Sequence, residues 1–185
     1  MKKRVLAILL ACILILGTGC QKATLENYKL FRSTPLGFSM EYPSFWSKSA
    51  DNANGLAVFL TPAEGYSDDY NESVSVRRFP LDMKGENAYN DYVRGYVSNL
   101  ESTLKNYKLV SEDDITLGGQ PAYRIVYEST DAKEGSEATS ELRFMQIFTQ
   151  KGEQVYVLTY MAEFSSYSYF LKNVDEMIST FQLLR

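Results

Sequence analysis

Three features of this sequence predict an α+β fold, in which one largely antiparallel β-sheet is flanked by helices. Several short segments between residues 38 and 164 alternate apolar and polar residues, which is typical of strands. Two longer segments place apolar residues three and four positions apart, which is typical of amphipathic helices. The short turn KGE around Gly152 joins the last two strand segments as a hairpin.

The first three strands are predicted before residue 81. FSMEYP (38–43) and SVSVRRFP (73–80) each alternate and end at a proline, and GLAVFLTP (55–62) lies between them. The residues grouped on a common apolar face are Phe38, Met40 and Tyr42 in the first segment, Leu56, Val58 and Leu60 in the second, and Val74 and Val76 in the third.

A long helix is predicted from Asn87, its expected N-cap, to about Asn106. Gly95 lies in its interior and destabilises it by about 1 kcal/mol relative to alanine. Its apolar face comprises Tyr89, Val93, Tyr96, Val97, Leu100 and Leu104.

Strand patterns return after this helix, and a second helix closes the chain. The segments 141–150 and 154–164 are apolar on both faces, which predicts that they lie in the middle of the sheet. Residues 129–140 show no apolar pattern and are predicted to form a hairpin loop. The other predicted strands are YKLVSE (107–112), ITLGG (115–119) and QPAYRIVYES (120–129). The final helix begins after Ser165 or Ser166 and has an apolar stripe of Phe170, Leu171, Val174, Met177, Ile178 and Phe181.

Charge and residue content exclude several functions. Once the basic residues at positions 2–4 are removed with a leader, 16 basic residues stand against 23 acidic ones, a net charge of −7. This argues against a nucleic-acid partner and against electrostatic attachment to anionic lipid, since both need clustered Lys and Arg. The chain has no histidine, and its two cysteines, Cys12 and Cys20, precede the predicted domain. We therefore expect no catalytic His or Cys, no zinc site, no iron–sulfur cluster and no other cofactor.

The N-terminus has the layout of a secretory signal peptide, predicted over residues 1–19. Three basic residues precede an unbroken apolar run, residues 5–16. The uncharged stretch up to Gly19 has 15 residues, fewer than the roughly 20 that span a bilayer.

The letters GTGC (17–20) end this leader and resemble the lipobox of bacterial lipoproteins. That resemblance implies cleavage between Gly19 and Cys20 and a diacylglyceryl group on the Cys20 sulfur. The lipobox prefers Leu three residues before the cysteine, whereas this chain has Gly17. Two acyl chains would anchor the protein stably. The alternative is that Cys20 is incidental to an ordinary leader.

These predictions divide the chain into a signal peptide (1–19), the lipidated Cys20 with a tether (20–34), and one domain (35–185). The location expected is the cell membrane, with the domain lipid-anchored on its extracytoplasmic side.

The order of the domain's segments resembles bacterial PsbP-like lipoproteins, relatives of the photosystem II extrinsic protein PsbP. The segments are LGFSMEYPSFW, a Tyr-rich helix, ITLGGQPAYRIVYES, and a last strand that leads into the final helix, over about residues 36–184. The resemblance implies a sheet sandwiched between helices and a non-enzymatic binding or assembly module. The partner is then an envelope protein or a small ligand. The calcium and chloride role of the photosynthetic members is not transferred to this chain.

A hydrolase that uses carboxylates or a serine is the alternative. Ser102 and Lys105 have Ser-x-x-Lys spacing, but no companion motif accompanies them. The acidic runs Glu112–Asp114 and Asp68–Asp69 with Glu72 are candidate calcium ligands or plain surface residues. Aromatic candidates for a binding surface, as opposed to core packing, are Trp46, Tyr66, Tyr70, Tyr167 and Tyr169.

Overall fold

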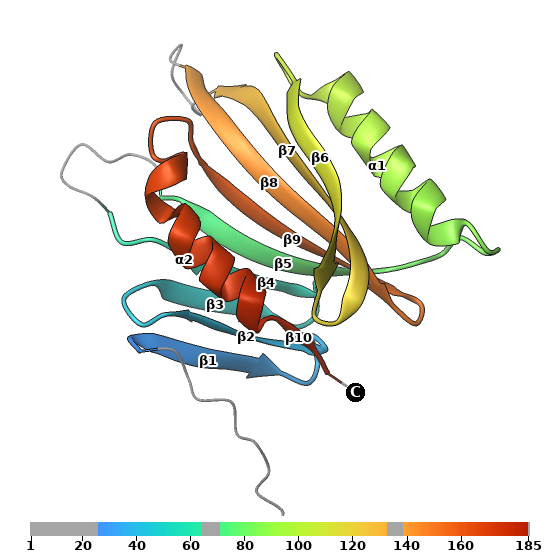
Figure 1. Cartoon of the computed structure of the whole chain (residues 1–185), viewed down its shortest axis with the longest axis horizontal. Coiled ribbons are helices and arrows are strands. Elements are labelled where there is room, and N and C mark those ends of the chain that lie inside the picture. The colour runs from blue at the N-terminus through green and yellow to red at the C-terminus, as the bar shows by residue number, and fades with distance from the viewer. Residues whose placement is uncertain (1–25, 64–70, 133–138, 185) are drawn as a thin grey trace, which may run out of the picture.

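The computed structural model describes residues 26–63, 71–132 and 139–184. Two sheets and two helices are arranged in layers (Figure 1). The elements are β1 (Tyr28–Ser33), β2 (Phe38–Pro43), β3 (Ser47–Asp51), β4 (Leu56–Leu60), β5 (Ser73–Pro80), α1 (Ala88–Thr103), β6 (Lys108–Leu117), β7 (Gln120–Ala132), β8 (Thr139–Lys151), β9 (Gln154–Glu163), α2 (Tyr167–Thr180) and β10 (Gln182–Leu183).

The main sheet has seven antiparallel strands in the order β3-β4-β5-β9-β8-β7-β6. The α+β class is therefore confirmed. Strand β9 occupies the centre with β8 beside it, which confirms the position predicted from their two apolar faces. Both predicted helices are present, and the segments 107–112 and 115–119 join into the single strand β6.

Two cores lie on opposite faces of this sheet. On one face, α2 and a small sheet cover a large core that includes Phe38, Phe59, Leu158 and Tyr160. On the other face, α1 covers a smaller core around Ile125, Phe148, Val155 and Val157. The alternation along β9 separates these sets, because Val155 and Val157 face α1 whereas Leu158 and Tyr160 face α2.

A second, three-stranded sheet, in the order β1-β2-β10, was not predicted. It also corrects the tether, because residues 28–33 form β1 instead of an irregular linker. The reason is Phe31, which is buried and packs at 5.3 Å from the Phe38 ring and 5.4 Å from the Phe59 ring. Burial of this aromatic side chain holds the segment in the sheet.

Leu56, Val58 and Leu60 share one face of β4, as the alternation predicted, but this is not the buried face of the strand. Ala57 and Phe59 are fully buried, whereas Leu60 is exposed. Both buried residues belong to the core under α2, and the core under α1 contains no described residue of β4. Leu56, Val58 and Leu60 therefore lie on the less covered face, whereas Phe59, the largest residue of the strand, packs in the core under α2.

No helix in the described part of the chain is long and apolar enough to cross a membrane.

Candidate functional site

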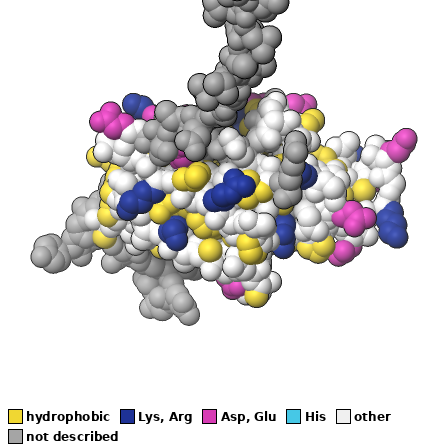
Figure 2. All heavy atoms as spheres, turned by 90° about the horizontal axis from the view of Figure 1, so that it is seen from below, with side chains coloured by type: hydrophobic (Ala, Val, Ile, Leu, Met, Phe, Trp, Pro, Cys, Tyr) yellow, Lys and Arg dark blue, Asp and Glu magenta, His cyan; other side chains and the backbone are white. Residues whose placement is uncertain are grey.

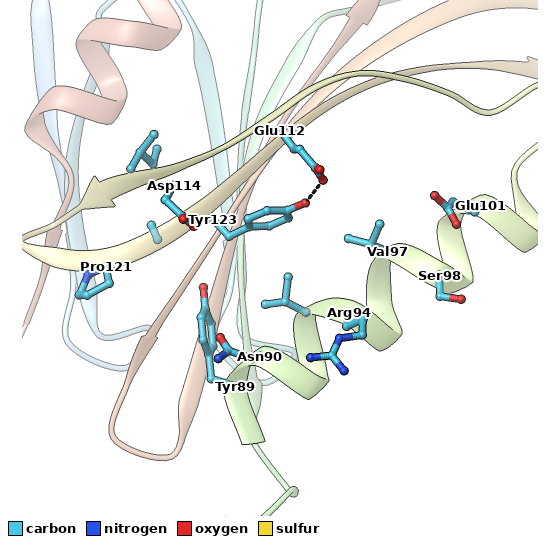
Figure 3. A pocket seen from close by; sticks show the side chains of 13 residues that line it. Tyr89, Asn90, Arg94, Val97, Ser98, Glu101, Glu112, Asp114, Pro121 and Tyr123 are labelled. Atoms are coloured by element: carbon cyan, nitrogen blue, oxygen red, sulfur yellow. Dashed lines mark hydrogen bonds between the residues drawn. The ribbon is translucent and has the colours of Figure 1, made fainter. Parts of the chain in front are cut away.

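An open cavity of about 850 Å³ lies between α1 and the hairpin of β6 and β7 (Figure 3). Its apolar walls come from Val93 and Val97 on α1 and from Ile115, Pro121 and Ala122 on the hairpin. Its volume is within the range of small-molecule sites, which are concave and mostly apolar.

The cavity exists because tyrosines support the helix on either side of short residues. The Tyr96 ring packs edge-on against Phe148 at 5.1 Å, and the Tyr89 hydroxyl donates a 2.8 Å hydrogen bond to the Phe148 carbonyl. The cavity is lined here by shorter side chains, those of Val93, Val97 and Ala122. They do not reach as far across the gap between helix and hairpin as the tyrosines do. Space therefore remains between the helix and the hairpin.

The cavity carries an excess of negative charge. Glu101, Glu112 and Asp114 line it, and the one basic residue among the lining side chains is Arg94. Arg94 is largely exposed and already lies 3.6 Å from the Asp91 carboxylate. A positively charged group would therefore be favoured in this cavity over an anion.

Tyr123 spans the floor of the cavity and donates a hydrogen bond to the Glu112 carboxylate (Figure 3). Burial, this hydrogen bond and the charge of Glu112 all raise the pKa of the Tyr123 phenol. Burial likewise raises the pKa of Tyr89 to about 12. Both phenols therefore stay protonated at neutral pH and present neutral rings to the cavity.

The acidic run 112–114 does not form a cluster. It lies on a strand, where successive side chains alternate, so Glu112 and Asp114 line the cavity while Asp113 pairs with Arg124. Figure 3 shows Glu101, Glu112 and Asp114 spread along the cavity. Within residues 26–63, 71–132 and 139–184, no group of three His, Cys, Asp or Glu residues could hold a metal ion.

The Ser-x-x-Lys pair lies at the end of α1 and does not enter the cavity. The Ser102 hydroxyl donates to the Asn99 carbonyl at 3.0 Å, as helix-surface serines commonly do. The Lys105 carbonyl accepts a 2.9 Å hydrogen bond from the Ser129 hydroxyl, which ties the end of the helix to β7.

Among the aromatic candidates, Trp46 and Tyr167 are buried in the core, whereas Tyr169 is 75% exposed. Trp46 packs edge-on against Phe170 at 5.9 Å. Glu72 is buried and accepts a 3.2 Å hydrogen bond from the Thr61 hydroxyl. The remaining predicted positions, Gly19, Cys20, Tyr66, Asp68, Asp69 and Tyr70, lie outside the described residues.

The cavity is not predicted by the sequence. Tyr89, Val93 and Val97 were expected on the apolar face of the helix, where their pattern indicates continuous core. The signal that was available is the mixture of tyrosines and valines on this face, together with charged residues on the strand below it. Only the helix position relative to β6 and β7 turns this mixture into a cavity.

The sequence model for the PsbP-like protein family matches residues 19–183. Among curated proteins no match is found. Similar solved structures include CyanoP, the cyanobacterial PsbP of Synechocystis, with 16% identity and a TM-score of 0.60 over 91% of this chain and 98% of that one.

Two further similar structures come from other organisms. LpqN of Mycobacterium tuberculosis, involved in cell envelope biogenesis, has 10% identity and a TM-score of 0.56 over 80% of this chain and 83% of that one. The Ran-binding protein Mog1p of Saccharomyces cerevisiae has 13% identity and a TM-score of 0.56 over 85% and 96%. At these identities, the likeness shows a shared fold.

Proposed function

Because the chain belongs to the PsbP-like protein family, we propose that it is an extracytoplasmic lipoprotein whose domain binds a partner and does not catalyse a reaction. The leader and the lipobox-like residues before Cys20 support the anchor. The open cavity under α1 carries the proposal of binding.

The chemistry of the cavity defines the ligand class. Valine, isoleucine and tyrosine side chains suit an apolar or aromatic body, and the three carboxylates suit a positively charged end. The ligand is therefore a small amphipathic cation. A protein partner that inserts a Lys or Arg side chain would use the same chemistry.

Similar folds offer limited support for a binding role. Mog1p is a Ran-binding protein, and LpqN is involved in cell envelope biogenesis. Mog1p links this fold to the binding of a partner. LpqN links it to the cell envelope, the compartment that the leader of this chain indicates. Neither identifies the partner of this protein.

The hydrolase alternative rests on one observation, the three carboxylates of the cavity. A pair of catalytic carboxyl groups in a glycosidase stands about 5 to 10 Å apart on either side of the bond to be cleaved. Here Glu112 and Asp114 lie on β6 and Glu101 lies on α1, so the three carboxylates do not converge on one point. Glu112 also accepts a hydrogen bond from Tyr123. Binding is therefore the function that this geometry supports best.

Mass spectrometry of the mature N-terminus tests the anchor. The expected product begins at Cys20 and carries a diacylglyceryl group on its sulfur. An intact leader, or a free thiol at position 20, would contradict this part of the proposal.

Phenethylammonium, phenethyl alcohol and 3-phenylpropionate test the ligand class, because they share an aromatic body and differ in charge. We expect NMR shifts at the cavity residues to saturate at the lowest concentration with phenethylammonium. Glu112→Gln and Asp114→Asn should each weaken that binding, whereas Asp175→Asn on α2 should not. Equal binding of all three probes, or shifts outside the cavity, would overturn this assignment.

A further inference from the structure

We propose that the edge of the domain formed by β1, β3 and the turn after β2 lies against the headgroups of an anionic membrane. This inference rests on the proposed lipid anchor at Cys20. It adds an orientation, in which one edge faces the bilayer and the cavity under α1 remains away from it.

The position of the anchor restricts the domain. Cys20 lies six residues before Glu26, where the described chain begins, and six extended residues span at most about 20 Å. Residues 28–33 then pair as β1, so the restriction applies to this edge of the domain first. The edge that carries β1 must stay close to the bilayer surface.

Two of the large apolar side chains that are exposed among the described residues lie at this edge. Leu30 on β1 is 58% exposed, and Phe45 in the turn after β2 is 56% exposed. The two segments are neighbours, since Tyr28 pairs with Pro43 and the Ser44 amide donates to the Asn27 carbonyl at 2.8 Å. Apolar side chains between basic ones are what interfacial membrane contact requires.

The basic residues of the edge supply charge complementarity. Lys29, Arg32 and Lys48 are all exposed, and the Lys48 ammonium lies 5.8 Å from the Phe31 ring, which places β3 beside β1. Figure 2 shows Lys and Arg side chains interspersed with hydrophobic ones across the middle of this face, while Asp and Glu lie toward its margins. The net charge of −7 had argued against anionic lipid, but the fold brings Lys48 of β3 beside β1, which carries Lys29 and Arg32.

Because salt screens charges at long range, the charges nearest the membrane determine how the domain is oriented. Electrostatic interactions fade over about 8 Å at physiological ionic strength, so lipid headgroups interact mainly with the nearest edge of the domain. The acidic cavity belongs to α1, β6 and β7, on the side of the molecule away from β1 (Figure 1). An anionic surface should therefore attract the β1 edge and repel the cavity side.

Single-cysteine labelling tests this orientation, because the mature chain has no cysteine after Cys20. The lipidated full-length mature protein is reconstituted into vesicles of phosphatidylglycerol and phosphatidylcholine that contain a doxyl-labelled lipid. A bimane label is placed at Leu30→Cys or Phe45→Cys, and the control label at Tyr169→Cys. Tyr169 is 75% exposed and lies in the first turn of α2, at the other end of that helix from β10 and the small sheet (Figure 1).

We expect the doxyl lipid to quench the labels at positions 30 and 45 but not the label at 169. The triple reversal Lys29→Glu, Arg32→Glu and Lys48→Glu should abolish this difference, whereas Arg94→Glu at the cavity should not. Vesicle flotation separates the two proposals, because protein that does not float lacks the anchor. Protein that floats but shows equal quenching at positions 30, 45 and 169 would overturn the orientation. Quenching of the label at position 30 that occurs only when another envelope protein is present would also overturn it.

Discussion

Asp113 on β6 and Arg124 on β7 lie directly opposite each other and form a bidentate ion pair. Arg124 donates from Nε to Oδ1 at 2.8 Å and from a terminal nitrogen to Oδ2 at 2.7 Å. Hydrogen bonds from the guanidinium, together with its positive charge, hold the pKa of Asp113 below its ordinary value. Such cross-strand pairs help to fix the register of neighbouring strands.

Arg124→Met should reduce stability in a pH-dependent way. A lowered folded-state pKa means that the ionised Asp113 stabilises the fold above its ordinary pKa and loses this effect as pH falls through the lowered value. Solvent reaches 42% of the Asp113 side chain, so screening limits the effect at pH 7 to less than about 1 kcal/mol. Urea unfolding at pH 7 and at about pH 2 measures the difference, which should disappear in acid. An equal loss at both pH values would show that packing, and not the ion pair, is responsible.

Gly95→Ala should stabilise the protein by up to about 1 kcal/mol. Gly95 lies in the interior of α1, is exposed, and has no atom within 4 Å of the position that a Cβ would take. Alanine therefore restricts the unfolded chain and favours the helix without steric conflict. Thermal or urea unfolding measures the gain. Gly152→Ala is the control and should be destabilising, because its φ of +58° suits glycine. A loss of stability in Gly95→Ala would contradict the packing described for α1.

Gly37→Ala should destabilise the protein more than Gly119→Ala does. Both glycines have positive φ, +77° and +80°, so both substitutions introduce comparable backbone strain. A Cβ at Gly37 would also overlap the Tyr156 hydroxyl oxygen, whereas the space at Gly119 is open. The difference between the unfolding free energies of the two variants measures the cost of the overlap with Tyr156. Introducing Tyr156→Phe into Gly37→Ala should recover part of the loss, and the absence of any recovery would exclude this overlap as its cause.

The sequence predicted those features of the fold that local residue patterns determine. It did not predict the features that depend on packing between distant segments. The periodicity of residues 87–106 and 154–164 depends on local alternation, and it located a helix and the central strand correctly. The faces of β4 depend on which of the two cores reaches this strand, and only the core under α2 includes its buried residues, Ala57 and Phe59. The strand β1 depends on Phe31 meeting Phe59 from another sheet. Local periodicity carries no information on either packing relationship.

The cavity illustrates the same limit. Glu112 and Asp114 were recognised as an acidic run, yet a run on a strand divides between two faces, and only pairing with Arg124 shows where Asp113 goes. Tyr89 and Tyr123 were assigned to apolar faces, and their rings do contact apolar neighbours. Whether α1 closes on β6 or stands away from it depends on the size of side chains on three elements at once.

Tyr123→Phe should strengthen the binding of phenethylammonium. The Tyr123 hydroxyl donates to Glu112, and this hydrogen bond disperses part of the carboxylate charge that a cation would otherwise meet. The phenylalanine ring keeps the cavity wall in place while Glu112 becomes free to accept from the ligand. If the freed Glu112 carboxylate gains about 1 kcal/mol of interaction with the cation, at the low end for a hydrogen bond to a charged group, the Kd falls roughly fivefold. Titration followed by NMR measures this change, and Tyr127→Phe, at a ring buried in the core below α1, is the matched control. Weaker binding in Tyr123→Phe than in the wild type would mean that the phenol itself holds the ligand and that Glu112 does not.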